Sequence, residues 1–168
     1  LDAYMNNAKR LNTEGIMIKH RNSEYLTGRK KGFWWKYKMK PMTLDGILIY
    51  AMSGSGRRAN QFTDYTFGLW TNNQKKELVT FTKAYSGLTN VEINELDYWI
   101  RRHTTKKYGP TRSVSPEKVF EIAFDRIHFS KRHKSGIALR FPRILRWRKD
   151  KVASDANILN DALSLIQN

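Results

Sequence analysis

Three lysines at alternate positions, Lys36, Lys38 and Lys40, stand out in this 168-residue sequence. Alternate residues of a β-strand face the same way, so the three ammonium groups would lie on one face of a strand. Their mutual repulsion is unfavourable unless an anion lies among them, and a phosphate group would supply that anion. An exposed sheet edge protected by lysines would produce the same pattern without a ligand. Trp35 and Tyr37 alternate with the lysines and are expected to face a core on the opposite side.

A carboxylate and a lysine flank a short apolar segment about twenty residues earlier. Glu14 precedes Gly15, and the strand predicted at 15–19 ends at Lys19. Glycine lets a ligand approach the backbone closely. One interpretation is a carboxylate for a metal ion beside a lysine for a phosphate; the other is an ordinary strand flanked by solvated charges. Alternation places Lys19 on the face opposite Glu14 unless the strand twists or bulges.

The third segment, residues 140–151, reads RFPRILRWRKDK and holds six lysine or arginine residues with aromatic and aliphatic residues between them. Arginine binds phosphate oxygens bidentately. The single acid of the segment, Asp150, can orient these bases or complete a metal shell. A basic strand that grips a DNA backbone is the alternative. Both interpretations require a phosphate-bearing ligand.

The elements that must position these segments fall into two stretches of unequal charge. Residues 1–41 carry ten lysine or arginine residues against three acids, and they contain a predicted helix end at 1–11 and two strands, 15–19 and 33–40. So few elements cannot enclose a core of their own. This stretch is therefore expected to be the end of a domain whose main body lies outside it.

Residues 42–168 show the pattern of a more complete domain. Apolar runs and alternation predict strands at 44–52, 64–71, 77–85 and 119–127 and from 137 to about 141, with a helix beginning at the capping box of Thr89 and Glu92 and a terminal helix at 154–166. A polar loop containing Gly109 and Pro110 is expected after the first helix. Three strands, a helix and two strands is the order of the OB-fold, a five-stranded barrel. The predicted fold class is mainly β with helices.

The amino-acid composition limits the classes of partner that the chain could bind. The net charge is +16 and the sequence pI is about 10.2, with 40% hydrophobic and 12% aromatic residues. This chain is too apolar and aromatic for a disordered tail, and its charge predicts a polyanionic partner, most simply nucleic acid. The sequence has no apolar run of about 18 residues, which argues against a membrane span. Cysteine is absent, which excludes thiol chemistry and fits a cytoplasmic location.

Taken together and in this order, the strings EGIMIK, WWKYK and RFPRILRWRKDK resemble the C-terminal half of ATP-dependent DNA ligases, in particular those of the bacterial, non-replicative branch. The resemblance covers essentially the whole chain. It implies a reaction in which an enzyme lysine is adenylated by ATP, the AMP passes to the 5′-phosphate of nicked double-stranded DNA, and the 3′-hydroxyl displaces it. The implied setting is DNA repair or recombination. Such phosphoryl transfer depends mainly on positioning and charge neutralisation.

The resemblance assigns residues 1–41 to the end of the adenylation domain. It implies that Glu14 binds the divalent metal, Mg²⁺ or Mn²⁺, and helps to hold the adenylate. Lys19 would lie near the nucleotide, while Lys36 and Lys38 would contact the α-phosphate of ATP. The anion that the alternating lysines require would then be that phosphate.

The resemblance assigns residues 42–168 to the OB-fold domain. Arg148, Asp150 and Lys151 match an RxDK element that orients the pyrophosphate leaving group, and Arg146 is placed with them at the nucleotide phosphates. Asp45 lies in the hinge region, where a pivot role is expected. The residues expected to contact the DNA backbone are Arg57, Arg58, Lys83, Arg132 and Lys134.

One departure from the family pattern matters more than the matches. The sequence contains no KxDG motif, and the nearest string, Leu44-Asp45-Gly46, lacks the required lysine. The adenylated lysine is therefore expected before Leu1, and this chain alone is expected to be inactive and monomeric. Two alternatives stay open: a stand-alone OB-fold module that binds nucleic acid without catalysis, and an RNA ligase or capping-type nucleotidyltransferase.

Overall fold

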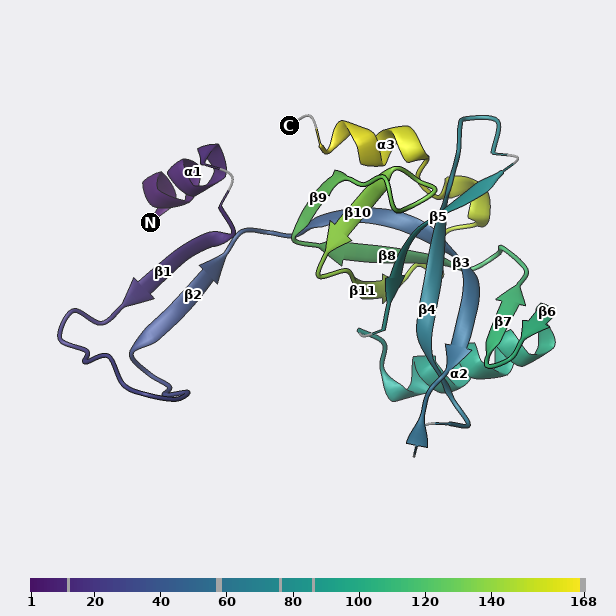
Figure 1. Ribbon diagram of the computed structural model, residues 1–168, viewed down its shortest axis with the longest axis horizontal. Helices are drawn as coiled ribbons and strands as arrows, with labels where there is room; N and C mark the ends of the chain where they lie inside the picture. Colours follow the sequence, from purple (N-terminus) through teal and green to yellow (C-terminus); the bar gives the residue numbers. More distant parts are fainter. Residues whose placement is uncertain (12, 57–58, 76, 86, 167–168) are drawn as a thin grey trace. The chain divides into compact units, whose positions relative to one another are not determined.

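The computed structural model describes residues 1–168 apart from 12, 57–58, 76, 86 and 167–168. The chain divides into two compact units, Leu1–Pro41 and Met42–Asn168 (Figure 1). Strands predominate in it, and the prediction of a mainly β fold with helices is confirmed. No helix in the described part of the chain is long and apolar enough to cross a membrane.

The first unit is a helix beside a two-stranded antiparallel sheet. It consists of α1 (Asp2–Arg10), β1 (Gly15–Lys19) and β2 (Trp34–Lys38). Gly15 has a φ of +136°, and a Cβ atom there would lie 2.2 Å from the carbonyl oxygen of Tyr37. Only glycine suits this position, because both the backbone conformation and the approach of β2 exclude a side chain. The strand β1 has the bounds that the sequence predicted, 15–19.

The aromatic residues of β2 do not face a core. Trp35 is 49% exposed and Tyr37 is 47% exposed, so the expectation that they are buried is wrong for this unit. The physical reason is that α1 and two strands offer too little apolar surface to cover both faces of the sheet.

The second unit is built on a long antiparallel sheet in the order β11-β8-β3-β4-β5. Its strands are β3 (Met42–Ser53), β4 (Phe62–Trp70), β5 (Leu78–Ala84), β8 (Val119–Phe124) and β11 (Arg143–Trp147). The first half of β3 pairs with β8 and the second half pairs with β7 (Thr111–Val114), which in turn pairs with β6 (Thr104–Tyr108). A separate ladder joins β9 (Arg126–Phe129) to β10 (Ile137–Arg140).

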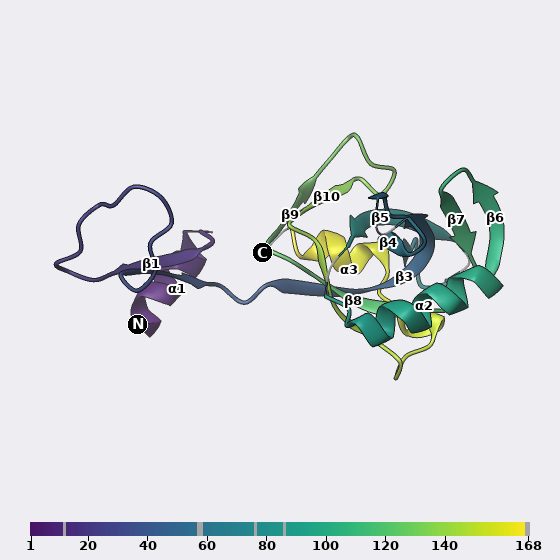
Figure 2. The same cartoon turned by 90° about the horizontal axis from the view of Figure 1, so that it is seen from below.

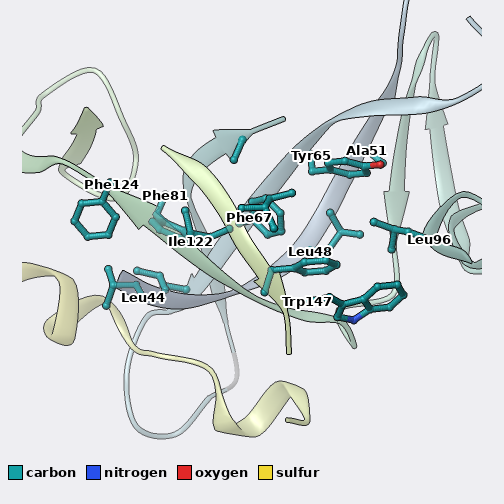
Figure 3. Close-up of a cluster of buried hydrophobic side chains, with 14 of the residues drawn as sticks. Leu44, Leu48, Ala51, Tyr65, Phe67, Phe81, Leu96, Ile122, Phe124 and Trp147 are labelled. Atoms are coloured by element: carbon teal, nitrogen blue, oxygen red, sulfur yellow. The ribbon is translucent and has the colours of Figure 1, made fainter. Parts of the chain in front are cut away.

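Alternation along these strands creates the core of the second unit. Figure 3 shows the inward-facing side chains of several strands meeting in one cluster. The rings of Phe67 and Phe120 have centroids 5.3 Å apart, and those of Phe120 and Trp147 are 5.4 Å apart, which ties β4, β8 and β11 together. Phe67 and Phe120 are fully buried. At about 25 cal/mol per Å² of apolar surface removed from water, such rings dominate the stability of the unit.

The helices follow the sequence signals to different degrees. In α2 (Asn90–Arg102), Thr89 Oγ1 accepts from the N–H of Glu92, and the carboxylate of Glu92 accepts from the N–H of Thr89. The predicted capping box is therefore confirmed. The N–H and the hydroxyl of Thr89 both donate to the Glu92 carboxylate, and these two hydrogen bonds lower the pKa of Glu92. The predicted terminal helix is shorter than expected: a 3-10 turn, Ala153–Asp155, precedes α3 (Leu159–Ser164).

Two further expectations were wrong in detail. The segment around Gly109 and Pro110 was expected to be a polar loop, but it is the turn of the β6–β7 hairpin, which Figures 1 and 2 show beyond the end of α2. The strand predicted at 119–127 is divided at Asp125 into β8 and β9. Backbone hydrogen bonds to β7 can hold a polar strand such as β6 without apolar side chains. Such a strand therefore gives no apolar signal in the sequence.

Candidate functional site

The register of the first unit brings the predicted nucleotide-binding residues together. Lys38 pairs with Gly15 and Lys36 pairs with Met17 across β1 and β2. A hollow of about 200 Å³ is lined by Glu14, Lys36 and Lys38, together with backbone and side-chain atoms of the neighbouring strand residues. Glu14, which regular alternation would place on the opposite face, also lines this hollow. Three residues that carry a carboxylate and two ammonium groups thus line one space.

Lys19 lies on the same face as these lysines. It pairs directly with Trp34, and directly opposite residues of an antiparallel pair share a face. Its Nζ atom lies 4.0 Å from the centroid of the Trp34 ring, a cation–π contact. Lys19 therefore shares a face of the sheet with Lys36 and Lys38, but it does not line the hollow that Glu14 lines.

The residues that line this hollow could supply only some of the ligands that a divalent metal ion needs. Among the described residues there is no group of three or more His, Cys, Asp or Glu side chains that could hold a metal ion. Mg²⁺ is commonly bound by one or two carboxylates together with substrate phosphates and water. Glu14 fits the role of one such ligand, with the remaining ligands coming from a nucleotide and from water.

In the second unit, the segment after β11 is held by a network of ion pairs. Arg148 Nη2 lies 2.7 Å from Asp150 Oδ2, and Arg148 Nη1 lies 3.3 Å from Asp45 Oδ2. Lys151 Nζ lies 2.5 Å from the same Asp45 oxygen. The structure therefore brings the three predicted residues of the RxDK element together and adds Asp45 as their common partner.

Asp45 is the residue whose contacts sequence reasoning missed. Its hinge role stays a prediction, while the structure shows that its carboxylate binds two cations and that the residue is only 8% exposed. Its backbone is anchored as well, since its N–H donates to Asn157 Oδ1 at 2.7 Å and its C=O accepts from the N–H of Asn157 at 3.0 Å. An acid in an apolar strand was a visible signal, but its partners lie more than 100 residues away in sequence.

Mutual hydrogen bonding keeps Arg148 and Asp150 ionised. The hydrogen bonds that Arg148 donates lower the pKa of Asp150 to about 2. The same hydrogen bonds raise the pKa of Arg148. Both groups therefore stay charged at neutral pH, as charge-assisted hydrogen bonds require.

Arg146 is directed elsewhere. Its Nε atom lies 2.6 Å from Glu121 Oε2, and these two residues are cross-strand partners between β11 and β8. Glu121 is in turn the cross-strand partner of Asp45. Arg146 and Arg148 were predicted to act together. In the structure they bind different carboxylates, Glu121 and Asp45, which are neighbours on one face of the sheet.

A hollow of about 510 Å³ borders the RxDK element. Arg148, Lys149 and Lys151 line it, and so does Lys118, which comes from the segment before β8. The Lys118 ammonium lies 5.2 Å from the centroid of Trp99 and 5.9 Å from that of Trp147. Lys118 was not predicted as a site residue. Only the tertiary structure shows four cations around one space.

The predicted DNA-contacting residues that the structure describes fall in two places. Lys83 is an exposed residue of β5, and Arg132 and Lys134 are exposed in the loop between β9 and β10. Arg57 and Arg58 lie outside the described residues. The structure thus does not gather Lys83, Arg132 and Lys134 on one strand.

A polar row crosses the sheet beside Lys83. The register pairs Lys83 with Thr66, Thr66 with Tyr50, Tyr50 with Ser113 and Ser113 with Lys106, across β5, β4, β3, β7 and β6. Directly opposite residues share a face, so hydroxyl groups occupy the middle of the row and a lysine stands at each end. A shallow hollow of about 440 Å³ on this face is lined by Tyr50, Thr66, Lys83 and the hairpin residue Tyr108.

Each unit by itself thus offers a cationic surface, the first on the strand pair β1–β2 and the second on the segment that follows β11. The family model for the ATP-dependent DNA ligase C-terminal region matches residues 58–151, more than half of the chain. The chain belongs to this family.

The most informative relatives are probable DNA ligases. The chain is 43% identical over 162 residues to one from Koribacter versatilis, covering 96% of this chain and 28% of the relative. It is 42% identical over 152 residues to one from Opitutus terrae, covering 90% of this chain and 15% of the relative. The chain therefore spans less than a third of the length of either. The crystal structure of the ligase domain of M. tuberculosis LigD has a similar fold, with a TM-score of 0.57 at 20% identity over 90% of this chain and 50% of that one.

Proposed function

We propose that this chain is the C-terminal catalytic and DNA-binding part of a ligase that seals nicks in double-stranded DNA with ATP, in repair or recombination. Residues 1–41 would end its adenylation domain, and residues 42–168 would form its OB-fold domain. The observation that carries the proposal is the convergence of Glu14, Lys36 and Lys38 on one hollow. A carboxylate for a divalent metal and two ammonium groups are what an α-phosphate needs as its negative charge shifts during transfer.

In this proposal the two lysines neutralise the α-phosphate of ATP while an enzyme lysine elsewhere in the complete ligase attacks it. The bond to the pyrophosphate breaks, and pyrophosphate leaves with the electron pair of that bond. Arg148 and Lys151 would bind this leaving group, because an arginine fork and a mobile ammonium group suit phosphate oxygens. Lys19 would lie near the nucleotide, and Glu14 would contribute one ligand to Mg²⁺ or Mn²⁺.

The polar row from Lys83 to Lys106 supports a second part of the proposal, a surface that follows the DNA backbone. Neighbouring strands lie about 4.8 Å apart, so four steps separate the two lysines by roughly 19 Å. Hydroxyl groups and lysines contact phosphate oxygens without reading bases. The high positive charge of the chain, +16, favours such binding. Arg57, Arg58, Arg132 and Lys134 would add contacts outside this row. We further propose that the protein is cytoplasmic and acts as a monomer.

The decisive experiment measures transfer of labelled AMP from ATP to the complete ligase. Lys36→Ala is expected to lower the rate by about 100-fold, the usual loss when one group that stabilises transition-state charge is removed. Lys40→Ala is the matched control: it removes the same charge two residues after Lys38, but Lys40 does not line the hollow. Equal losses in the two variants, or none in either, would contradict the proposal and leave a non-catalytic nucleic-acid-binding module as the better description.

A further inference from the structure

Arg148 and Lys151 are not available to a phosphate in this structure, because carboxylates already hold them. The Nε and Nη2 atoms of Arg148 donate to Asp150 at 2.7 to 3.3 Å, and Nη1 donates to Asp45 at 3.3 Å. Both bidentate edges of the guanidinium therefore carry a hydrogen bond. Lys151 donates to the same Asp45 carboxylate at 2.5 Å.

We propose that Asp45 is a positioning residue that acts as an internal anion: its carboxylate occupies the cation pair of Arg148 and Lys151 until pyrophosphate displaces it. The inference rests on the proposed function, in which these two cations bind the leaving group. It gives a role to a buried acid that is otherwise part of neither the nucleotide hollow nor the DNA surface.

Because Asp45 is buried, its carboxylate can bind Arg148 and Lys151 firmly. Its side chain is 10% exposed and that of Arg148 is 15% exposed, so water screens this pair only weakly. Two hydrogen bonds with Asn157 fix the backbone of Asp45. The carboxylate is therefore a stationary anchor, and the movement needed to exchange partners falls on the long side chains of the cations.

The space into which the cations would turn lies beside them. Arg148 and Lys151 line the hollow of about 510 Å³, whereas Asp45 is not among its lining residues. Lys118 lines the same hollow and adds positive charge, while Lys149 lines it together with the acids Glu95, its ion-pair partner, and Glu117. Pyrophosphate carries several negative charges, so it attracts Arg148 and Lys151 more strongly than the single carboxylate of Asp45 does. A modest side-chain rotation exchanges one anion for the other.

The test measures the binding of inorganic pyrophosphate to the 168-residue chain by titration calorimetry. Asp45→Asn removes the competing charge while keeping a side chain of similar size. We expect pyrophosphate to bind this variant about tenfold more tightly than the unmodified chain, equivalent to about 1.4 kcal/mol. A merely structural role for Asp45 predicts the opposite sign, because disordering the RxDK element would weaken binding.

Glu95→Gln is the matched control. Glu95 lines the same hollow and lies 2.5 Å from Lys149, so this variant changes the net charge by the same amount without touching Arg148 or Lys151. We expect its affinity for pyrophosphate to change less than twofold, because Glu95 and Lys149 are both about half-exposed and water screens their attraction. Equal gains in Asp45→Asn and Glu95→Gln would show a general effect of charge and overturn the inference.

Further measurements separate the remaining outcomes. Asp45→Ser is a second uncharged variant, used if thermal melting shows that Asp45→Asn does not fold. No gain in either variant overturns the inference. In that case, loss of adenylation in the complete ligase carrying Arg148→Ala would leave the proposed function standing, while an unchanged rate would remove the role of Arg148 as well. A short DNA duplex in place of pyrophosphate is expected to bind Asp45→Asn and Glu95→Gln equally, because the phosphate backbone is gripped on another face.

Discussion

The hollow of the first unit and the RxDK network of the second both gather cations, but they treat them differently. Lys36 and Lys38 line an open space with Glu14 at its edge, on a small sheet whose aromatic residues stay half-exposed. Arg148 and Lys151 are drawn onto the buried Asp45 at the surface of a well-packed core. The two sites therefore differ in how deeply the carboxylate beside the cations is buried: Glu14 is exposed, whereas Asp45 is 8% exposed.

The largest expected effect of this difference is on the stability of the folded chain. Arg148→Ala leaves the buried Asp45 with Lys151 as its remaining charged partner among the described residues, and we expect a clear loss in the free energy of unfolding. Lys36→Ala removes an exposed cation and should change that free energy by less than about 0.5 kcal/mol. Urea unfolding of the two variants measures both values. Equal destabilisation would remove the distinction between an open and an occupied cation site.

A second test concerns two neighbouring lysines of the β6–β7 hairpin. Lys106 pairs with Ser113 and belongs to the polar row, while Lys107 pairs with Arg112, whose partner in β3 is the buried Ala51, so Lys107 faces the other side. Both lysines are exposed and differ only in direction.

In a titration of duplex DNA against salt, Lys106→Ala is expected to weaken binding several-fold and to reduce the slope of log affinity against log salt by about 1. Lys107→Ala should change the slope by much less. The proposed DNA surface would be contradicted by identical slopes for the two variants, since net charge alone would then account for the binding.

The smallest expected effect is a titration. Because Arg148 lowers the pKa of Asp150 to about 2, below the ordinary value near 3.9, the Asp150 carboxylate contributes to stability above about pH 4. That contribution is lost as the pH falls from about 4 through 2. NMR titration of the Asp150 carboxyl carbon should show a midpoint near 2, and Arg148→Ala should return it to the ordinary range. A midpoint unaffected by the substitution would mean that the ion pair is not formed in solution.

Local signals predicted much of the fold. The alternation of Tyr65, Phe67 and Leu69 identified β4, and the Thr89 and Glu92 pair identified the start of α2, because both patterns depend on residues close together in the chain. The β6–β7 hairpin escaped prediction. Its strands are short and polar, and they are ordered by pairing with β3, a contact across some sixty residues of sequence.

The site divides in the same way. By itself, the sequence determined which residue types could bind phosphate, since the period-two lysines and the RxDK string are visible as letters. Only the tertiary structure decided which of them meet: Glu14 with Lys36 and Lys38, but Arg146 with Glu121 and Lys151 with Asp45. The physical reason is that side-chain chemistry is a property of each residue, whereas an ion pair depends on strand register and burial, which bring distant residues within 4 Å of one another.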